Sequence, residues 1–283
     1  MYNKRLDNLC CNSKIVELKP RDKFVFISDC HRGDGSYRDS LIQNYNIYKG
    51  ALNYYLKNKF KLIEIGDGDE LWENKDFRDI GFVYKDIFEI LLKFKKRNDL
   101  YLIWGNHDMI KKNKKRLTKI INFSKNEAFY KVLMDLYGEG DICEGIKLTN
   151  GENEYLVIHG HQVDFFNSDL WLLSRFLLRS VWSKLQNFGI KTPISPARNI
   201  SKRNKIDSRI IEWCTKNNKR IIAGHTHSSR ISDLKTGEYY NDGCCVFPNH
   251  ITTLEYENQR FKLIKWTLDI ELDNRIVLSR KEL

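Results

Sequence analysis

Five short apolar runs in the chain each end in polar residues that can bind a metal ion. The clearest run covers residues 100–104 and is followed by Gly105, Asn106, His107 and Asp108. Such a run predicts a buried strand, and polar residues directly after it lie where active sites form at the carboxyl edge of an α/β sheet. One such tetrapeptide is common among proteins, but the chain repeats the arrangement four more times. The repetition favours a shared site at a sheet edge.

Strand and helix patterns alternate in the first half of the chain. Short apolar runs predict strands at 24–27, 60–65, 100–104, 155–158 and 220–223. Apolar side chains recur every three or four residues at about 39–59 and 77–96, which predicts helices, and 111–137 is basic and mostly helical by pattern. The tail alternates in strand fashion at 244–247, 251–256 and 261–266. The order βαβαβ followed by antiparallel β indicates an α/β fold.

Length and composition indicate a globular protein. The 283 residues suit one large α/β domain or two small ones, and an apolar content of 41% argues against disorder. The first 20 residues lack the apolar stretch of a signal peptide, and no apolar run approaches the roughly 20 residues that cross a bilayer. We therefore expect a cytoplasmic protein without a transmembrane segment. Seven cysteines without a C-x-x-C motif favour reduced thiols over disulfides or a thiolate zinc site.

Positive charge is concentrated in two parts of the chain. The formal net charge is +11, and residues 162–220 hold 12 Lys and Arg against 4 Asp and Glu. A second cluster, at 111–119, follows the Gly105 tetrapeptide. Solvent-exposed helix faces explain such clusters without any ligand. The alternative is attraction of an anionic partner: a phosphate ester, a nucleotide or an acidic membrane surface.

A long helical segment at about 162–219 interrupts the alternation, with Pro193 and Pro196 in its middle. It is rich in Leu, Phe and Trp, and Arg175 and Arg179 lie on the same predicted helix. One interpretation is a helix that packs on the core. A second is a cap whose apolar side meets a partly apolar substrate and whose two arginines contact it. A helix at a membrane surface is the third.

The placement of histidine is the strongest single observation. Six of the seven histidines stand at the ends of apolar runs, next to Asp, Asn or Gly: His31, His107, His159, His161, His225 and His227. One histidine at such a place is usually structural, but six are difficult to explain by chance. Imidazole, carboxylate and amide oxygen together suit Mn, Fe, Zn, Ni or Co rather than Ca. Roughly seven such groups exceed what one ion needs and fit two ions.

The motifs carry a resemblance to a known family. In chain order they are Asp29-x-His31, Gly66-Asp67-x-x-Glu70, Gly105-Asn106-His107-Asp108, His159-Gly160-His161 and Gly224-His225-x-His227. This set resembles the five ordered motifs of the calcineurin-like metallophosphoesterases and spans residues 29–227. The resemblance implies a four-layer α/β/β/α sandwich in which helices flank two mixed β-sheets. It implies a single domain over 1–283 with a helical cap insert at about 162–219.

The resemblance also implies a role for each motif residue. Asp29, His31 and His227 would hold one metal ion, Asn106, His159 and His225 would hold the second, and Asp67 would bridge both. Asp69 is a rival for the bridge, but Asp67 directly follows the strand and its glycine, as in the family. His107 would contact the phosphate or protonate the leaving oxygen, with Asp108 orienting its ring. Two more substrate contacts are predicted: Arg32, beside the first motif, and His161, for which structural packing is the alternative.

The implied reaction is hydrolysis of a phosphomonoester, phosphodiester or pyrophosphate bond. Two divalent transition-metal ions, manganese first and Fe, Zn, Ni or Co as alternatives, would bridge a water and lower its pKa. The resulting hydroxide would attack phosphorus in line with the leaving group, while both metals and His107 offset charge on the phosphoryl oxygens. The expected partner is an anionic phosphoester, with or without an apolar part.

Two features are similar to the UDP-2,3-diacylglucosamine pyrophosphatase branch of this superfamily: the helical insert between the fourth and fifth motifs, and Gly66-Asp67-x-x-Glu70. In that branch the insert caps the site and receives acyl chains. A nucleotide-lipid pyrophosphatase with peripheral membrane contact is therefore one alternative. A protein of another class on the same fold is the other: a scaffold that has lost its metals, or a nucleic-acid binder that uses the basic insert. The complete ligand set argues against the scaffold.

Overall fold

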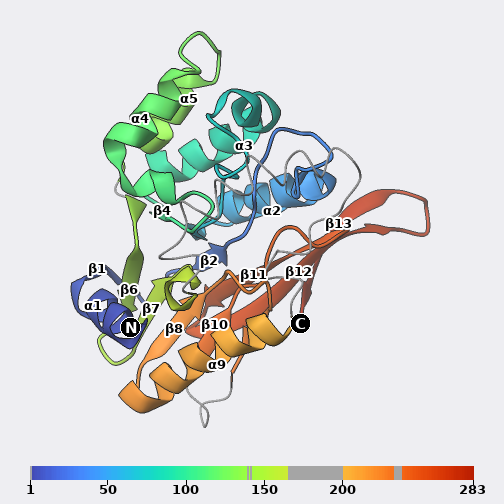
Figure 1. The fold of residues 1–283 in the computed structure, drawn as a ribbon. Helices are drawn as coiled ribbons and strands as arrows, with labels where there is room; N and C mark the ends of the chain where they lie inside the picture. Colours follow the sequence, from blue (N-terminus) through green and yellow to red (C-terminus); the bar gives the residue numbers. More distant parts are fainter. Residues whose placement is uncertain (1, 139, 141, 165–199, 233–237) are drawn as a thin grey trace.

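The strands form two sheets that pack face to face (Figure 1). The computed structural model describes residues 2–138, 140, 142–164, 200–232 and 238–283. The six-stranded sheet has the order β1 (Lys14–Glu17), β6 (Gly145–Thr149), β7 (Glu154–Ile158), β8 (Arg220–Ala223), β10 (Tyr239–Asn241), β9 (Arg230–Ile231). The seven-stranded sheet has the order β13 (Ile276–Glu282), β12 (Arg260–Ile270), β11 (His250–Glu257), β2 (Phe24–Ile27), β3 (Lys61–Ile65), β4 (Leu100–Ile103), β5 (Ile142–Cys143). Both sheets are mixed: β2, β3 and β4 are parallel in one, β7 and β8 in the other.

Helices cover the outer face of each sheet (Figure 1). The 3-10 turn η1 (Ile42–Asn44), α2 (Tyr45–Lys57) and α3 (Arg78–Lys96) lie on the seven-stranded sheet, followed by α4 (Lys114–Asn122), α5 (Tyr130–Leu133) and the π-helical turn η3 (Met134–Gly138). On the six-stranded sheet lie α1 (Tyr2–Asn12) and α9 (Ile200–Asn217). Two 3-10 turns, η2 (Met109–Lys112) and η4 (His161–Val163), come after β4 and β7. The predicted four-layer α/β/β/α sandwich is confirmed.

Three apolar cores join the four layers. The first, which includes Phe88, lies between α2, α3 and the seven-stranded sheet; the second, with Phe26 and Val157, lies between the two sheets; the third, with Trp213, lies beneath α1 and α9. Strands β2 and β3 are therefore covered on both faces, which is why their sequences are continuous apolar runs rather than alternating ones. The exception is Glu64, a buried carboxylate inside β3.

The structure confirms the predicted strands in the first half of the chain to within one or two residues, and it corrects two elements. Residues 244–247 form no strand; they follow β10 as an irregular segment in which Cys244 and Cys245 are buried and Cys244 N donates to Thr252 Oγ1. The helix predicted from about residue 39 begins only at η1, because the Asp39 carboxylate accepts hydrogen bonds from the backbone N–H groups of Leu41 and Ile42 and so forms a turn there.

The predicted cap insert is described in part. Helix α9 buries Ile206, Ile210 and Trp213 in the core against the six-stranded sheet, so this part of the insert is packed on the core. Arg175 and Arg179 fall in 165–199, which lies outside the described residues. The cap, the single domain and both arginine contacts therefore stay predictions. Among the helices that the structure describes, none is long and apolar enough to cross a membrane.

Candidate metal centre

The metal-competent side chains of all five motifs come from strand ends at one edge of the sandwich. Asp29 and His31 follow β2, Asp67 follows β3, Asn106 follows β4, His159 follows β7, and His225 and His227 follow β8. Three groups have ligand atoms within 4.8 Å of one another: Asp29 with His31 and His227, His31 with Asp67 and His107, and Asp67 with His159 and His225. Because each group joins residues from different strands, the two sheets together form one site.

Unpaired buried atoms show that these residues fit a bound cation. Asn106 Oδ1, His159 Nε2 and His225 Nε2 are buried and make no hydrogen bond within the described part of the chain. His159 Nε2 lies 3.2 Å from Asp67 Oδ2, but without hydrogen-bond geometry. Leaving a buried polar atom unpaired costs roughly 1–3 kcal/mol, and all three atoms have a lone pair that a transition metal accepts.

Hydrogen bonds on the far side of two rings turn their Nε2 atoms towards the carboxylates. His159 Nδ1 donates to the carbonyl oxygen of Ile65 over 2.7 Å, and His31 Nδ1 donates to Glu70 over 2.9 Å. His31 Nε2 then lies 3.8 Å from Asp29 Oδ1 and 3.9 Å from Asp67 Oδ2. Fixing the tautomer and the ring in this way is how metal-binding histidines are generally prepared.

The backbone is strained at five of the seven predicted ligands. Asp29, His31, Asp67, His225 and His227 have φ of 50°, 50°, 49°, 66° and 54°. Residues other than glycine rarely adopt this left-handed region, and each costs roughly 1–3 kcal/mol, so such strain gathers at functional sites.

Two glycines are required beside the strained residues. A Cβ atom at Gly66 would lie 2.6 Å from Gly105 N, and one at Gly105 would lie 2.1 Å from Asp67 Oδ1. These clashes explain why the motif loops after β3 and β4 begin with glycine: only a residue without a side chain lets the two loops approach each other and Asp67.

Opposite charges meet in this buried site. Burial alone would raise the pKa of Asp29 and of Asp67, but neighbouring His227 and His159 lower both pKa values well below the ordinary range. Burial likewise disfavours a charged His159, yet Asp67 raises its pKa to about 9. The carboxylates are thus held as anions, and a metal ion bound here would displace a proton from His159.

His107 lies beside the predicted ligands His31 and Asp67. Its side chain is 21% exposed, its ring stacks on Trp72 at 4.2 Å, and its Nδ1 lies 2.7 Å from one Glu70 oxygen and 2.9 Å from the other. Since His107 lowers the pKa of Glu70 to about 2 despite burial, this carboxylate can only accept, and His107 Nδ1 donates. His107 Nε2 is therefore the ring nitrogen left for chemistry.

The predicted role of Asp108 is wrong. Its carboxylate accepts from Gly105 N over 2.7 Å, from Gly68 N over 3.2 Å and from Lys111 Nζ over 2.7 Å, and it does not contact the ring of His107. Asp108 therefore holds the two motif loops together, while Glu70 orients His107. Glu70 is part of the second motif in the sequence. Its pairing with His107 could not be predicted, because it depends on how two separate loops fold against each other.

Arg32 and Asp69 belong to a buried ionic network behind the site. Arg32 is fully buried and donates to Asp69 and, through both terminal nitrogens, to Glu64. Asp69 Oδ2 also lies 2.7 Å from Lys111 Nζ. The predicted phosphate contact of Arg32 is therefore wrong, because its hydrogen bonds are directed into the core. The pairing of Asp69 with Arg32 and Lys111 argues against it as the bridging ligand, and Asp67 as the bridge stays a prediction.

Replacing Lys111 with Met should destabilise the fold strongly. Lys111 is 4% exposed, and its loss would leave Asp69 and Asp108 buried with less compensating charge. We expect the free energy of unfolding in urea to fall by about 3–5 kcal/mol. The control is Lys115→Met, an exposed position expected to change it by less than about 0.5 kcal/mol. Equal urea midpoints for the two variants would show that the network does not stabilise the protein.

His161 is buried beside the predicted ligand His159. It is fully buried, with its ring centroid 5.3 Å from that of Trp104 and 5.5 Å from that of His159. Neither ring nitrogen has a hydrogen-bond partner among the described residues. Burial fits the packing alternative, and the substrate contact stays a prediction.

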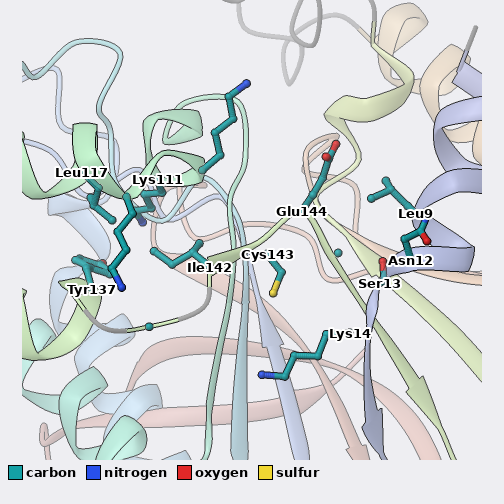
Figure 2. A pocket seen from close by; sticks show the side chains of 14 residues that line it. Leu9, Asn12, Ser13, Lys14, Lys111, Leu117, Tyr137, Ile142, Cys143 and Glu144 are labelled. Carbon is teal, nitrogen blue, oxygen red and sulfur yellow. The ribbon is translucent and has the colours of Figure 1, made fainter.

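A cavity of about 500 Å³ lies apart from the metal-competent residues (Figure 2). Figure 2 shows Lys111 and Tyr137 on one side of it and Asn12 on the other. Lys112 and Lys114 line it as well, but none of the predicted metal ligands does. The basic cluster at 111–119 is therefore divided between the buried network, this cavity and exposed helix surface.

Comparison with known proteins identifies one family. Residues 22–229 match the family model described as calcineurin-like phosphoesterase. This range contains all five motifs. A comparison with curated proteins gave no match.

Similar solved structures include three with complete or nearly complete coverage of their own chains. An archaeal phosphodiesterase has 13% identity over 86% of this chain and 99% of its own, with a TM-score of 0.41. YfcE, a phosphoesterase from E. coli, has 13% identity over 92% and 98%, with a TM-score of 0.39. Vacuolar Protein Sorting 29 from Cryptosporidium parvum has 14% identity over 93% and 98%, with a TM-score of 0.40. Similarities this distant carry no argument about function.

Proposed function

The chain belongs to the calcineurin-like phosphoesterase family, and from this premise we propose that it hydrolyses phosphoesters with two divalent metal ions. The observation that carries the proposal is the convergence of Asp29, His31 and His227, and of Asp67, His159 and His225, into adjoining groups of ligand atoms. Both groups are buried. A buried cluster of carboxylates and unpaired imidazoles has no structural benefit that would offset its cost without cations.

The proposed ligands divide between two positions. Asp29, His31 and His227 would hold the first ion, and Asn106, His159 and His225 would hold the second. Asp67 would be shared, since its Oδ2 lies 3.9 Å from His31 Nε2 and 3.2 Å from His159 Nε2. When bound, the ions supply Lewis acidity and a water of lowered pKa. Manganese stays the first expectation for their identity.

His107 supplies the proton transfer in this proposal. Glu70 accepts a hydrogen bond from Nδ1, and its negative charge stabilises a ring that is protonated on both nitrogens. Such a ring can give its Nε2 proton to the leaving oxygen of a bound ester and becomes neutral. Stacking on Trp72 keeps the ring in that orientation. Backbone N–H groups of Gly105 and Gly68, held by Asp108, fix the loops that carry Asp67 and Asn106.

The substrate is proposed only as a phosphomonoester, phosphodiester or pyrophosphate. The UDP-2,3-diacylglucosamine-type alternative rests on the insert, most of which lies outside the described residues. A cytoplasmic location stays a prediction. The decisive assay is a panel of p-nitrophenyl phosphate, bis(p-nitrophenyl) phosphate and a nucleoside diphosphate ester with Mn²⁺ and with EDTA. We expect Mn²⁺-dependent release from at least one class, and no turnover of any class would contradict the proposal.

A further inference from the structure

The turn that carries His225 and His227 is held in a conformation that its residues disfavour. Both histidines have positive φ, 66° and 54°, at a cost of roughly 1–3 kcal/mol each. Thr226 lies between them and is fully buried. A contact that holds Thr226 in place therefore also sets the backbone positions from which the side chains of His225 and His227 extend.

Asp207, on the inner side of α9, fixes Thr226. Thr226 Oγ1 donates to Asp207 Oδ1 over 3.0 Å, and the hydroxyl of Tyr239 donates to the same oxygen over 2.9 Å. Asn241 Nδ2 supports the beginning of the turn by donating to Gly224 O over 2.8 Å. All four side chains are buried, so water does not compete for these bonds.

A carboxyl group at this place is costly. Asp207 is 1% exposed, and burial raises its pKa. Arg230 faces it from 3.9 Å, too far for a hydrogen bond, and Asp207 Oδ2 has no hydrogen-bond partner among the described residues. An apolar side chain would fill the space beneath α9 without this cost. An apolar residue could not, however, accept the hydrogen bonds from the hydroxyl groups of Thr226 and Tyr239.

A second contact from α9 reaches the same neighbourhood. Lys202 Nζ pairs with Asp164 Oδ2 over 3.0 Å, and that oxygen lies 3.7 Å from His225 Nε2. Arg209 also donates to the carbonyl oxygen of Val163 over 3.0 Å. Helix α9 thus contacts both strand ends of the six-stranded sheet that carry predicted ligands.

We propose that Asp207 is a positioning residue for the metal centre: through Thr226 it fixes the turn so that His225 and His227 present their ring nitrogens to the ions. The inference rests on the proposed function, because it concerns these histidines as ligands. It also assigns a role to α9, which supports the centre from behind.

Calorimetric titration of Mn²⁺ into the chelator-treated full-length chain tests this inference. Asp207→Ala and Thr226→Val both remove the hydrogen bond between these two side chains, and each should weaken Mn²⁺ binding by about 10–100-fold. Asp207→Ala also removes the bond from Tyr239, and Thr226→Val also removes the bond from Asn241 Nδ2 to Thr226 Oγ1 over 3.1 Å. The double variant should weaken binding by less than the product of the two single effects, because the shared bond is lost only once. The matched control is Glu212→Ala, an exposed acidic position on α9, which should bind as wild type does.

The outcomes separate this inference from the proposed function. If Asp207→Ala lowers the melting temperature but both single variants bind Mn²⁺ as tightly as wild type, Asp207 is merely structural and the inference is wrong. If Asp207→Ala does not fold, the nearly isosteric Thr226→Val is used alone, and Mn²⁺ binding as tight as in wild type shows that the inference is wrong. If wild type itself binds no Mn²⁺, the proposed function fails, and this inference fails with it.

Discussion

Replacing Asp67 with Asn is expected to lower kcat/KM for a phosphoester by about 10³-fold. Loss of one electrostatic contact to a transition state lowers the rate by about 10²–10³-fold, and this expectation is the upper end of that range. Asp67 is the residue whose carboxylate faces both ligand groups, and its pKa is held low by His159 despite burial. An amide of the same shape keeps the packing but removes the negative charge between the two ion positions. Steady-state kinetics with Mn²⁺ would measure the loss.

The matched control is Asp79→Asn, an exposed position in the first turn of α3. It makes the same chemical change in the segment after the same strand and should leave kcat/KM unchanged. Bound metal should fall in Asp67→Asn when measured by plasma mass spectrometry. Wild-type turnover by Asp67→Asn would exclude this residue as the bridging ligand.

Replacing His107 with Ala is expected to lower kcat by about 10²–10⁴-fold, the usual contribution of a positioned general acid. Metal content should stay at the wild-type level, because His107 is proposed to act on the substrate. This combination distinguishes it from Asp67→Asn, in which activity and metal are lost together. A fall in bound metal for His107→Ala would instead make His107 a ligand, as its grouping with His31 and Asp67 also allows.

Glu70→Gln provides the companion test for His107. The amide keeps a hydrogen-bond acceptor near His107 Nδ1 but removes the charge that stabilises the ring as an acid. A leaving group of low pKa needs little protonation, so both variants should lose less activity on p-nitrophenyl phosphate than on an alkyl phosphate. Equal losses on both esters would argue against proton donation by His107.

The ligand positions could be predicted because the signal is local. Each predicted ligand lies within a few residues of the end of an apolar run, and parallel strands bring such ends to one edge whatever the details of packing. The element pattern alone indicates an α/β fold, and the four layers were predicted only through the resemblance to the calcineurin-like metallophosphoesterases. The element pattern does not find β1 or β13, whose short or half-exposed sequences lack a clear apolar pattern.

The corrected residues share another physical cause. The hydrogen-bond partners of Arg32 and Asp108 include residues from other loops and strands of the chain. Sequence patterns do not show which side chains from separate segments meet. Glu64 did give a signal, since a carboxylate within the apolar run 60–65 requires a buried cation, and Arg32 is that cation. Glu70 was part of a recognised motif, but only the fold shows that it meets both His31 and His107.

The number of metal ions that activity requires tests the proposed dinuclear centre most directly. Chelator-treated protein should be titrated with Mn²⁺ while hydrolysis of the best ester from the substrate panel is followed. We expect no turnover without metal and a rise that saturates at two Mn²⁺ per chain, since the proposed ligands form two adjoining groups and Asp67 Oδ2 lies near His31 of the first and His159 of the second. Turnover that is unchanged in EDTA, or a folded protein that binds no Mn²⁺, would contradict the metal centre described here.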